Sequence, residues 1–256
     1  MASAMKLLSW DAAWQDVVLM ARAGGANVLV IAGVFYLLPT LAIELWLPLP
    51  QLKSLDWDGI RQLNDFLVEN APLLLVTTLA GWFGTAAIYR LLLDNRRPTV
   101  GEALKAATAL FISVVLLNWL TGFALLLGLF AFIIPGIYLL GRTAVAVPAL
   151  MAENIPNPIA AFNRSLELTR GNGWRTVGLI LIVVVVAEIA SSAVQFVVGI
   201  LVGAVTSGEV ERGLIALLAA GLTTLQGLLF VVLSTAIYRQ LADFHPSARP
   251  RPAAGS

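Results

Sequence analysis

The sequence has no cysteine, a single histidine and few charged residues, and each shortage excludes a class of protein. Without cysteine the chain has no disulfide, no thiol nucleophile and no Cys-ligated metal, and His245 alone cannot build a zinc site or a catalytic triad. Charged residues make up 12% of the chain, about half the roughly 25% of an average soluble domain. The net charge of +1 gives no reason to expect a nucleic-acid partner. We therefore expect neither a disordered chain nor an ordinary soluble globule.

Long uncharged apolar stretches stand where the charges are missing, and their length is typical of membrane-spanning helices. The stretch between Lys105 and Arg142 has 36 uncharged residues. One helix of that length would measure about 54 Å, well beyond the roughly 30 Å core of a bilayer, so it must fold back, and we expect the turn at Thr121 and Gly122. The sequence thus predicts an all-α polytopic membrane protein. Its six expected spans are residues 26–46, 71–93, 106–121, 125–151, 176–198 and 214–238.

Basic residues are distributed unevenly in this layout. If the N-terminus, the 94–105 and 152–175 loops and the C-terminus share one side, thirteen of the sixteen Lys and Arg residues lie there. Because Lys and Arg are enriched in cytoplasmic loops, both termini are expected in the cytoplasm.

The six spans group as three hairpins, and we expect a short cytoplasmic interfacial helix before each of them. Trp10 and Trp14 lie on one apolar face before the first hairpin. Thr99 and Glu102 form a capping-box pattern before the second, and Asn157 can cap a helix before the third.

Two helix ends have nearly the same sequence. Residues 87–94 and 236–243 are identical at six of eight positions, which predicts internal repeats; the alternative is that Tyr and Arg simply anchor helices at the membrane interface. The expected organisation is one membrane domain over residues 1–243, with repeats at 9–94, 98–151 and 157–243 and a flexible tail at 244–256.

Glu188 is the most costly residue for a bilayer, because a carboxylate at the middle of a span costs at least ~2.5 kcal/mol. Gln226 lies at the same depth in the sixth span, and Arg142 is the only basic residue within reach. Two interpretations are open: a proton or ligand site formed by these three residues, or a buried structural pair. Pro135 and Gly136 interrupt the fourth span and predict a helix kink, with a broken helix that lines a substrate path as the alternative.

Basic and aromatic residues gather on the expected cytoplasmic face, a combination typical of a surface that contacts anionic lipid headgroups. The positive-inside bias alone would account for most of the basic ones. The residues of this expected headgroup surface are Arg96, Arg97, Arg164, Arg170, Arg175, Trp10, Trp14 and Trp174.

On the opposite side, Asp56 and Asp58 belong to an amphipathic segment whose acidic face we expect to be solvated. A cation site or an acid/base pair is the alternative for these two carboxylates. Gly199 and Gly203 form a GxxxG pattern, which predicts close helix packing within the protein or between copies.

Several blocks in the middle of the chain resemble YciC-like bacterial inner-membrane proteins, and the similar membrane domain attached to some glycerophosphodiester phosphodiesterases. The blocks are Ile134-Pro135-Gly136-Ile137-Tyr138 with Arg142, Val147-Pro148-Ala149, Asn163 through Gly171 with Trp174, and Arg96-Arg97-Pro98 with Gly101 through Leu104. The resemblance implies a six-span protein of the bacterial inner (plasma) membrane. It supplies no catalytic residue, because the phosphodiesterase activity belongs to a separate soluble barrel.

The sequence contains no phosphate-binding loop, no GxSxG and no HExxH motif, so we expect no enzymatic activity, no metal and no cofactor. The leading hypothesis is a scaffold or accessory protein that engages membrane lipids, with anionic headgroups at the cytoplasmic leaflet and a protein partner or a second copy as further partners. The alternative is a small transporter or lipid permease with its polar site at Glu188, Gln226 and Arg142. A membrane-embedded hydrolase that uses Asp56 or Asp58 is the third hypothesis.

Overall fold

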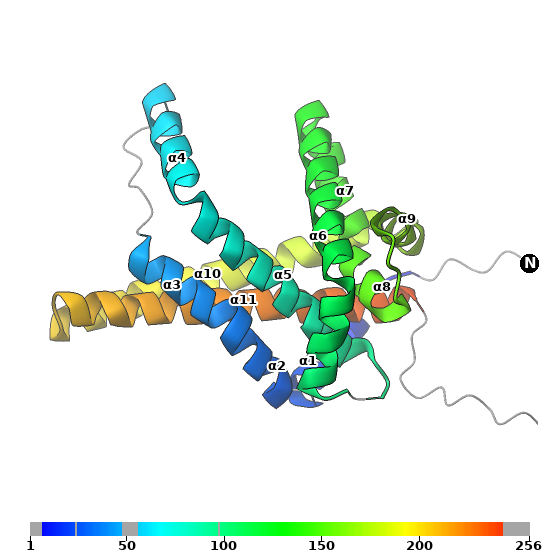
Figure 1. Cartoon of the computed structure of the whole chain (residues 1–256), viewed down its shortest axis with the longest axis horizontal. Helices are drawn as coiled ribbons and strands as arrows, with labels where there is room; N and C mark the ends of the chain where they lie inside the picture. Colours follow the sequence, from blue (N-terminus) through cyan, green and yellow to red (C-terminus); the bar gives the residue numbers. More distant parts are fainter. Residues whose placement is uncertain (1–6, 24, 48–55, 97, 243–256) are drawn as a thin grey trace, which may run out of the picture.

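The computed structural model describes residues 7–23, 25–47, 56–96 and 98–242, and within these residues helices are the only regular secondary structure (Figure 1). The helical structure confirms the all-α class, and six helices are long and apolar enough to cross a membrane, the same number as the expected spans. The elements are α1 (Trp10–Ala23), α2 (Gly25–Ala32), η1 (Gly33–Leu37), α3 (Leu38–Trp46), α4 (Trp57–Glu69), α5 (Ala71–Leu93), α6 (Val100–Ala131), α7 (Ile133–Thr143), α8 (Ala146–Glu153), α9 (Pro158–Leu168), α10 (Gly173–Val205) and α11 (Glu209–Leu241).

The first of the six long helices contains a π-helical turn, η1, between α2 and α3. Pro39, near the start of α3, has no N–H group, and in a regular α-helix its ring would clash with the carbonyl of Phe35. A π-helical turn inserts one extra residue and relieves that clash. The neighbouring helix α5 makes room for the wider turn at Gly84, where a Cβ would lie 2.5 Å from the Cβ of Phe35. The π-helical turn and α5 are therefore fitted to each other.

α6 and α7 meet at a turn that lies about ten residues beyond the predicted one. α6 runs without interruption through Thr121 and Gly122 to Ala131, so the prediction of a turn at those two residues is wrong. A glycine inside a helix costs only about 1 kcal/mol relative to alanine, which does not end an otherwise apolar helix. The chain turns instead at Phe132, whose backbone is extended (φ −164°, ψ 144°).

Two glycines explain how this turn can be tight. A Cβ on Gly128 would lie 3.0 Å from the Cα of Gly136, and a Cβ on Gly136 would lie 2.7 Å from the backbone nitrogen of Leu129. Pro135 is the third residue of α7, in the first turn, where helical N–H groups lack intrahelical partners and proline is tolerated. Pro135 and Gly136 therefore begin a helix and do not kink the middle of a span, which corrects the prediction for these residues.

Unlike the predicted turn, both predicted helix caps are present in the structure. Glu102 N donates to Thr99 Oγ1, and Thr99 N donates to Glu102 Oε2 at 2.8 Å, which confirms the capping box. The helix that it begins is the long helix α6 itself, so a separate short helix before the second hairpin is wrong. Asn157 caps α9 as predicted, by accepting from the N–H groups of Ile159 and Ala160.

The buried core lies at one end of the long helices, where α5, α8 and α11 contact one another. We call this region the base; its largest buried side chains are Ile88, Leu150, Met151, Leu233 and Ile237. The two similar sequence segments both reach it, because Tyr89 of α5 and Tyr238 of α11 are buried there. These observations do not test the predicted internal repeats. The predicted tail lies outside the described residues.

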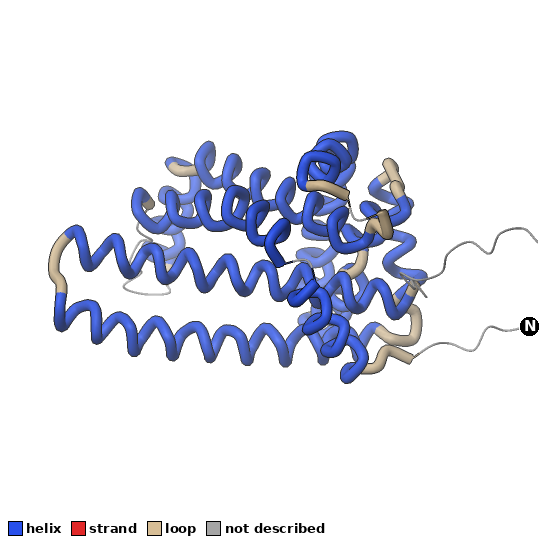
Figure 2. The backbone as a smooth tube through the Cα atoms, turned by 90° about the horizontal axis from the view of Figure 1, so that it is seen from below, coloured by secondary structure: helices blue, strands red, loops and turns tan. Residues whose placement is uncertain are grey.

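From the base the long helices run outward in different directions, α6 with α7, α10 with α11, and α3 with α5 (Figures 1 and 2). Away from the base they expose apolar side chains, most completely at the α6–α7 turn, where Phe130 is 96% exposed. The fold is thus packed like a globular protein at one end only.

The fit between the π-helical turn and α5 yields a stability prediction. Gly84→Ala should lower the unfolding temperature in detergent, because the new methyl group overlaps the Cβ of Phe35 and overpacking of this kind costs about 1–3 kcal/mol. Gly81→Ala is the matched control on the same helix, since a Cβ there meets nothing within 4 Å. Equal unfolding temperatures for the two variants in a thermal-shift assay would contradict this packing.

Candidate functional site

The structure joins two of the three residues proposed for a midplane site. Gln226 Nε2 of α11 donates to Glu188 Oε2 of α10 at 2.9 Å, so these two side chains lie at the same level along their helices. Glu188 is exposed on the outer face of α10, beside a shallow groove of about 90 Å³ whose other walls are apolar. The carboxyl group is therefore neither buried in the protein nor reached by a large polar cavity.

Arg142 does not belong to this pair. Its Nη1 donates to Tyr138 Oη at 3.2 Å and its Nη2 to the carbonyl of Leu166, while its own carbonyl accepts from the hydroxyl group of Ser165 at 2.7 Å. Arg142 thus ties α7 to α9. The Arg142 side chain lies beside the start of α10, because a Cβ on Gly173 would be 2.9 Å from Arg142 Cδ. Glu188 lies 15 residues further along α10, a distance of about 22 Å at about 1.5 Å per residue. The three residues form no common site.

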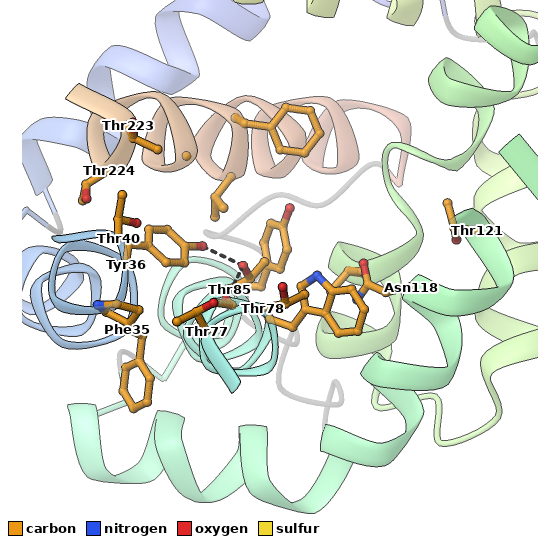
Figure 3. Close-up of a pocket in the computed structure, with 18 of the residues that line it drawn as sticks. Phe35, Tyr36, Thr40, Thr77, Thr78, Thr85, Asn118, Thr121, Thr223 and Thr224 are labelled. Atoms are coloured by element: carbon orange, nitrogen blue, oxygen red, sulfur yellow. Dashed lines mark hydrogen bonds between the residues drawn. The ribbon is translucent and has the colours of Figure 1, made fainter. Parts of the chain in front are cut away.

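A larger cavity lies between α3, α5, α6, α7 and α11, with a volume of about 600 Å³. Eight threonines line it together with Asn118 and the aromatic residues Phe35, Tyr36, Trp82, Tyr89 and Phe230. Figure 3 shows side chains of the first span, α5, α6 and α11 around one common space. Every described residue that lines this space is uncharged. The eight threonines of what we call the central cavity are Thr40, Thr77, Thr78, Thr85, Thr121, Thr143, Thr223 and Thr224.

The central cavity is closed at the base and accessible away from it. Tyr89, Ala146 and Val231, which border it next to the base, are at most 3% exposed. One helix shows the gradient, because α5 passes from exposed Thr78 through half-buried Thr85 to buried Tyr89.

The π-helical turn contributes directly to the cavity wall. Tyr36, within η1, has its hydroxyl group 2.6 Å from Thr85 Oγ1 of α5 (Figure 3). Thr85 donates its one hydroxyl proton to the carbonyl of Gly81 at 2.8 Å, so Tyr36 must be the donor in the pair. This hydrogen bond holds the first span against α5 at mid-cavity.

The residues expected to contact lipid headgroups differ in their availability. Arg164 forms ion pairs with Glu153 (3.0 Å) and Glu167 (3.5 Å). Partial burial alone would lower the pKa of the Arg164 guanidinium, but the two carboxylates have the larger combined effect and raise that pKa. Arg96 is 89% exposed and lies 3.9 Å from Asp94. The other described members, Arg170, Arg175, Trp10, Trp14 and Trp174, are exposed, and Arg97 lies outside the described residues.

Of the two carboxylates singled out on the opposite side, Asp58 is exposed and Asp56 has a structural role. Asp56 Oδ1 accepts from Gly59 N at 3.0 Å and so caps α4, the amphipathic helix that the sequence predicted there. Among the residues that the structure describes, no group of three or more His, Asp or Glu side chains is placed to hold a metal ion.

The central cavity is the feature that sequence reasoning missed. A signal was present in the second span, because Thr77, Thr78, Gly81 and Thr85 recur at the three- to four-residue spacing of one helix face. The other walls come from spans more than 30 residues away, and no local pattern indicates that they meet α5 there.

Comparison with known proteins identifies no relative: no protein-family model matches the chain, and neither a curated protein nor a solved structure matches it. The resemblance to the YciC-like family therefore stays a prediction that depends on the residues quoted for it.

The Glu188–Gln226 pair can be tested by removing one or both partners. Gln226→Leu should lower thermal stability in lipid nanodiscs, because it strips the carboxyl group of its hydrogen-bond donor, at a cost of about 1–3 kcal/mol. The double variant Glu188→Leu/Gln226→Leu should recover the stability of the original protein, since no polar group is left unpaired. A double variant as unstable as Gln226→Leu alone would show that the pair is not the cause.

Proposed function

We propose that this chain is a non-enzymatic integral membrane protein that binds an uncharged amphipathic molecule of the bilayer in its central cavity, as a small lipid carrier or permease. The observation that supports this proposal is a cavity of about 600 Å³ with mostly apolar, uncharged walls that carry several hydroxyl groups. Ligand sites commonly have volumes of roughly 300–1,000 Å³. The proposal adopts the transporter class, which was the alternative to the scaffold hypothesis from the sequence, and moves its site away from Glu188 and Arg142.

The chemistry of the walls favours a neutral ligand. An ion that enters a low-dielectric cavity loses its hydration and needs an opposite charge, and none lines this space within the described residues. Threonine hydroxyl groups can bind a neutral polar group, while Phe35, Trp82 and Phe230 offer surface to a hydrocarbon chain. A molecule with both parts is an amphiphile, and the bilayer itself supplies such molecules.

The hypothesis that the protein is only a scaffold leaves the central cavity unexplained. Exposed Trp10, Trp14 and Trp174 suit contact with the lipid interface, as do Arg170 and Arg175. These contacts are compatible with a scaffold and with a carrier alike. A scaffold has no use for a cavity between its helices, which is why we favour the carrier.

For the orientation, we propose three transmembrane hairpins in the bacterial inner membrane, formed by α2–α3 with α5, α6 with α7–α8, and α10 with α11. In this arrangement α1 and α9 lie at the cytoplasmic interface, and the base and both termini face the cytoplasm. The excess of basic residues on that side supports this orientation.

Filling the cavity tests the proposed function. Gly81 lines the cavity and a Cβ on it meets nothing within 4 Å, so Gly81→Phe should occupy ligand space without breaking the helix. We expect mass spectrometry of native membrane discs to find an amphiphile enriched over bulk lipid with the original protein and reduced at least about fivefold with this variant, the equivalent of 1 kcal/mol. Gly213→Phe, on α11 outside the cavity, is the control and should retain it. Equal retention by both variants, or no enrichment in any sample, would refute the proposal.

The absence of cysteine makes the orientation directly testable. Ser207→Cys, in the turn between α10 and α11, should react with a membrane-impermeant thiol reagent once the outer membrane is permeabilised. Arg170→Cys, in the turn between α9 and α10, should react only after the inner membrane is opened. The cysteine-free chain gives the background, and the reverse order of labelling would overturn the proposed topology.

A further inference from the structure

Most of the threonine hydroxyl protons around the central cavity are already used in hydrogen bonds within the helices. Five of the eight threonines donate to carbonyl groups of their own helices: Thr77 and Thr78 to Leu74, Thr85 to Gly81, Thr143 to Leu139 and Thr224 to Ala220. A threonine hydroxyl group has one proton and two lone pairs. Once the proton is used within the helix, the group offers only acceptors to a ligand.

Two other polar groups of the cavity also keep acceptors for a ligand. Tyr36 donates its proton to Thr85, as derived above, so its oxygen offers lone pairs. Asn118 Nδ2 donates to the carbonyl of Val114 at 2.9 Å, which commits one amide proton and leaves the other, together with the carbonyl oxygen of the side chain, for a ligand. Among the groups with these defined bonds, the acceptors left for a ligand therefore outnumber the free donors.

Acceptors in an apolar space favour a ligand that brings donors, because each buried polar group without a partner costs free energy. A phosphate or carboxylate headgroup brings further acceptors and a negative charge, neither of which these walls complement. A lipid whose only polar groups are esters or ethers likewise brings acceptors and no donor. A hydroxyl group brings a donor and no charge.

We infer that the ligand of the central cavity is a neutral lipid with a free hydroxyl group, of the diacylglycerol type, whose hydroxyl proton is donated to the threonine oxygens. This inference rests on the proposed function, because it names the chemical class of the amphiphile bound there. Diacylglycerol is the simplest probe of the class, with one free hydroxyl group, no charge and two acyl chains.

The experiment compares two probes that differ at one position, where a methyl group in one replaces the hydroxyl proton of the other. Dioctanoylglycerol and its O-methyl ether have the same chains and nearly the same shape, but the ether cannot donate. Binding of each radiolabelled probe to the full-length protein in phosphatidylcholine nanodiscs gives a ratio of affinities. We expect the alcohol to bind about fivefold more tightly than the ether, the effect of one hydrogen bond.

Substituting each partner of the Tyr36–Thr85 hydrogen bond in turn distinguishes a change in ligand selectivity from a general loss of structure. Thr85→Val removes an acceptor and releases the Tyr36 hydroxyl as a donor, so the preference for the alcohol should fall toward one or reverse. Tyr36→Phe leaves Thr85 with a freed lone pair, so the preference should persist or rise. Thr108→Val is the control, because Thr108 makes the same bond to its own helix at Leu104 but does not line the cavity.

Each outcome decides between the two proposals. A preference for the alcohol that falls in Thr85→Val and persists or rises in Tyr36→Phe supports the inference. Equal binding of both probes, or a ratio unchanged in all variants, overturns the inference and leaves the cavity as an amphiphile site. If neither probe binds and the discs show no enriched amphiphile, both proposals fail.

Discussion

The close contact of α5, α8 and α11 at the base determines where the remaining helices can lie. These three helices bury Ile88, Leu150 and Leu233 against one another, and the long helices leave the base in different directions. Divergent helices cannot remain in contact along their whole length, so space opens between them beyond the base. The central cavity follows from packing that is tight at the base and looser beyond it, where helix pairs such as α10–α11 and α3–α11 remain in contact.

A proline and a glycine shape one wall of the central cavity. Pro39 is accommodated by the π-helical turn, which brings Tyr36 to Thr85, and Gly84 provides the room for it. π-helical turns are rare and are often found at functional sites, because they aim side chains that a regular helix would turn elsewhere. Here the turn directs a tyrosine hydroxyl group at a threonine of another helix.

Local patterns in the sequence were sufficient for some of these features and not for others. Helix caps such as Asn157, and the six apolar helices, follow from residues that are neighbours in the chain. The turn at Phe132 depends on the mutual approach of Gly128 and Gly136, and the sequence does not reveal it because no charged residue marks a boundary between residues 106 and 141. Arg142 was assigned to Glu188 because both are charged and near a membrane, whereas its actual partners, Tyr138 and Leu166, are a side chain one turn away and a backbone carbonyl. The central cavity was missed because Thr85, Asn118 and Thr224 meet only in three dimensions.

The apolar turn between α6 and α7 has a consequence for biogenesis. A helical hairpin enters a bilayer by carrying its turn across the hydrocarbon core, and each charged residue in the turn adds roughly 2.5–3.5 kcal/mol to that crossing. In the topology that we propose, the α10–α11 hairpin carries Glu209, Glu211 and Arg212 across the bilayer, whereas the stretch from Leu125 to Ile137 in the second hairpin is entirely apolar. On that topology, the tip of the second hairpin crosses the hydrocarbon core at a much lower free-energy cost than the tip of the third.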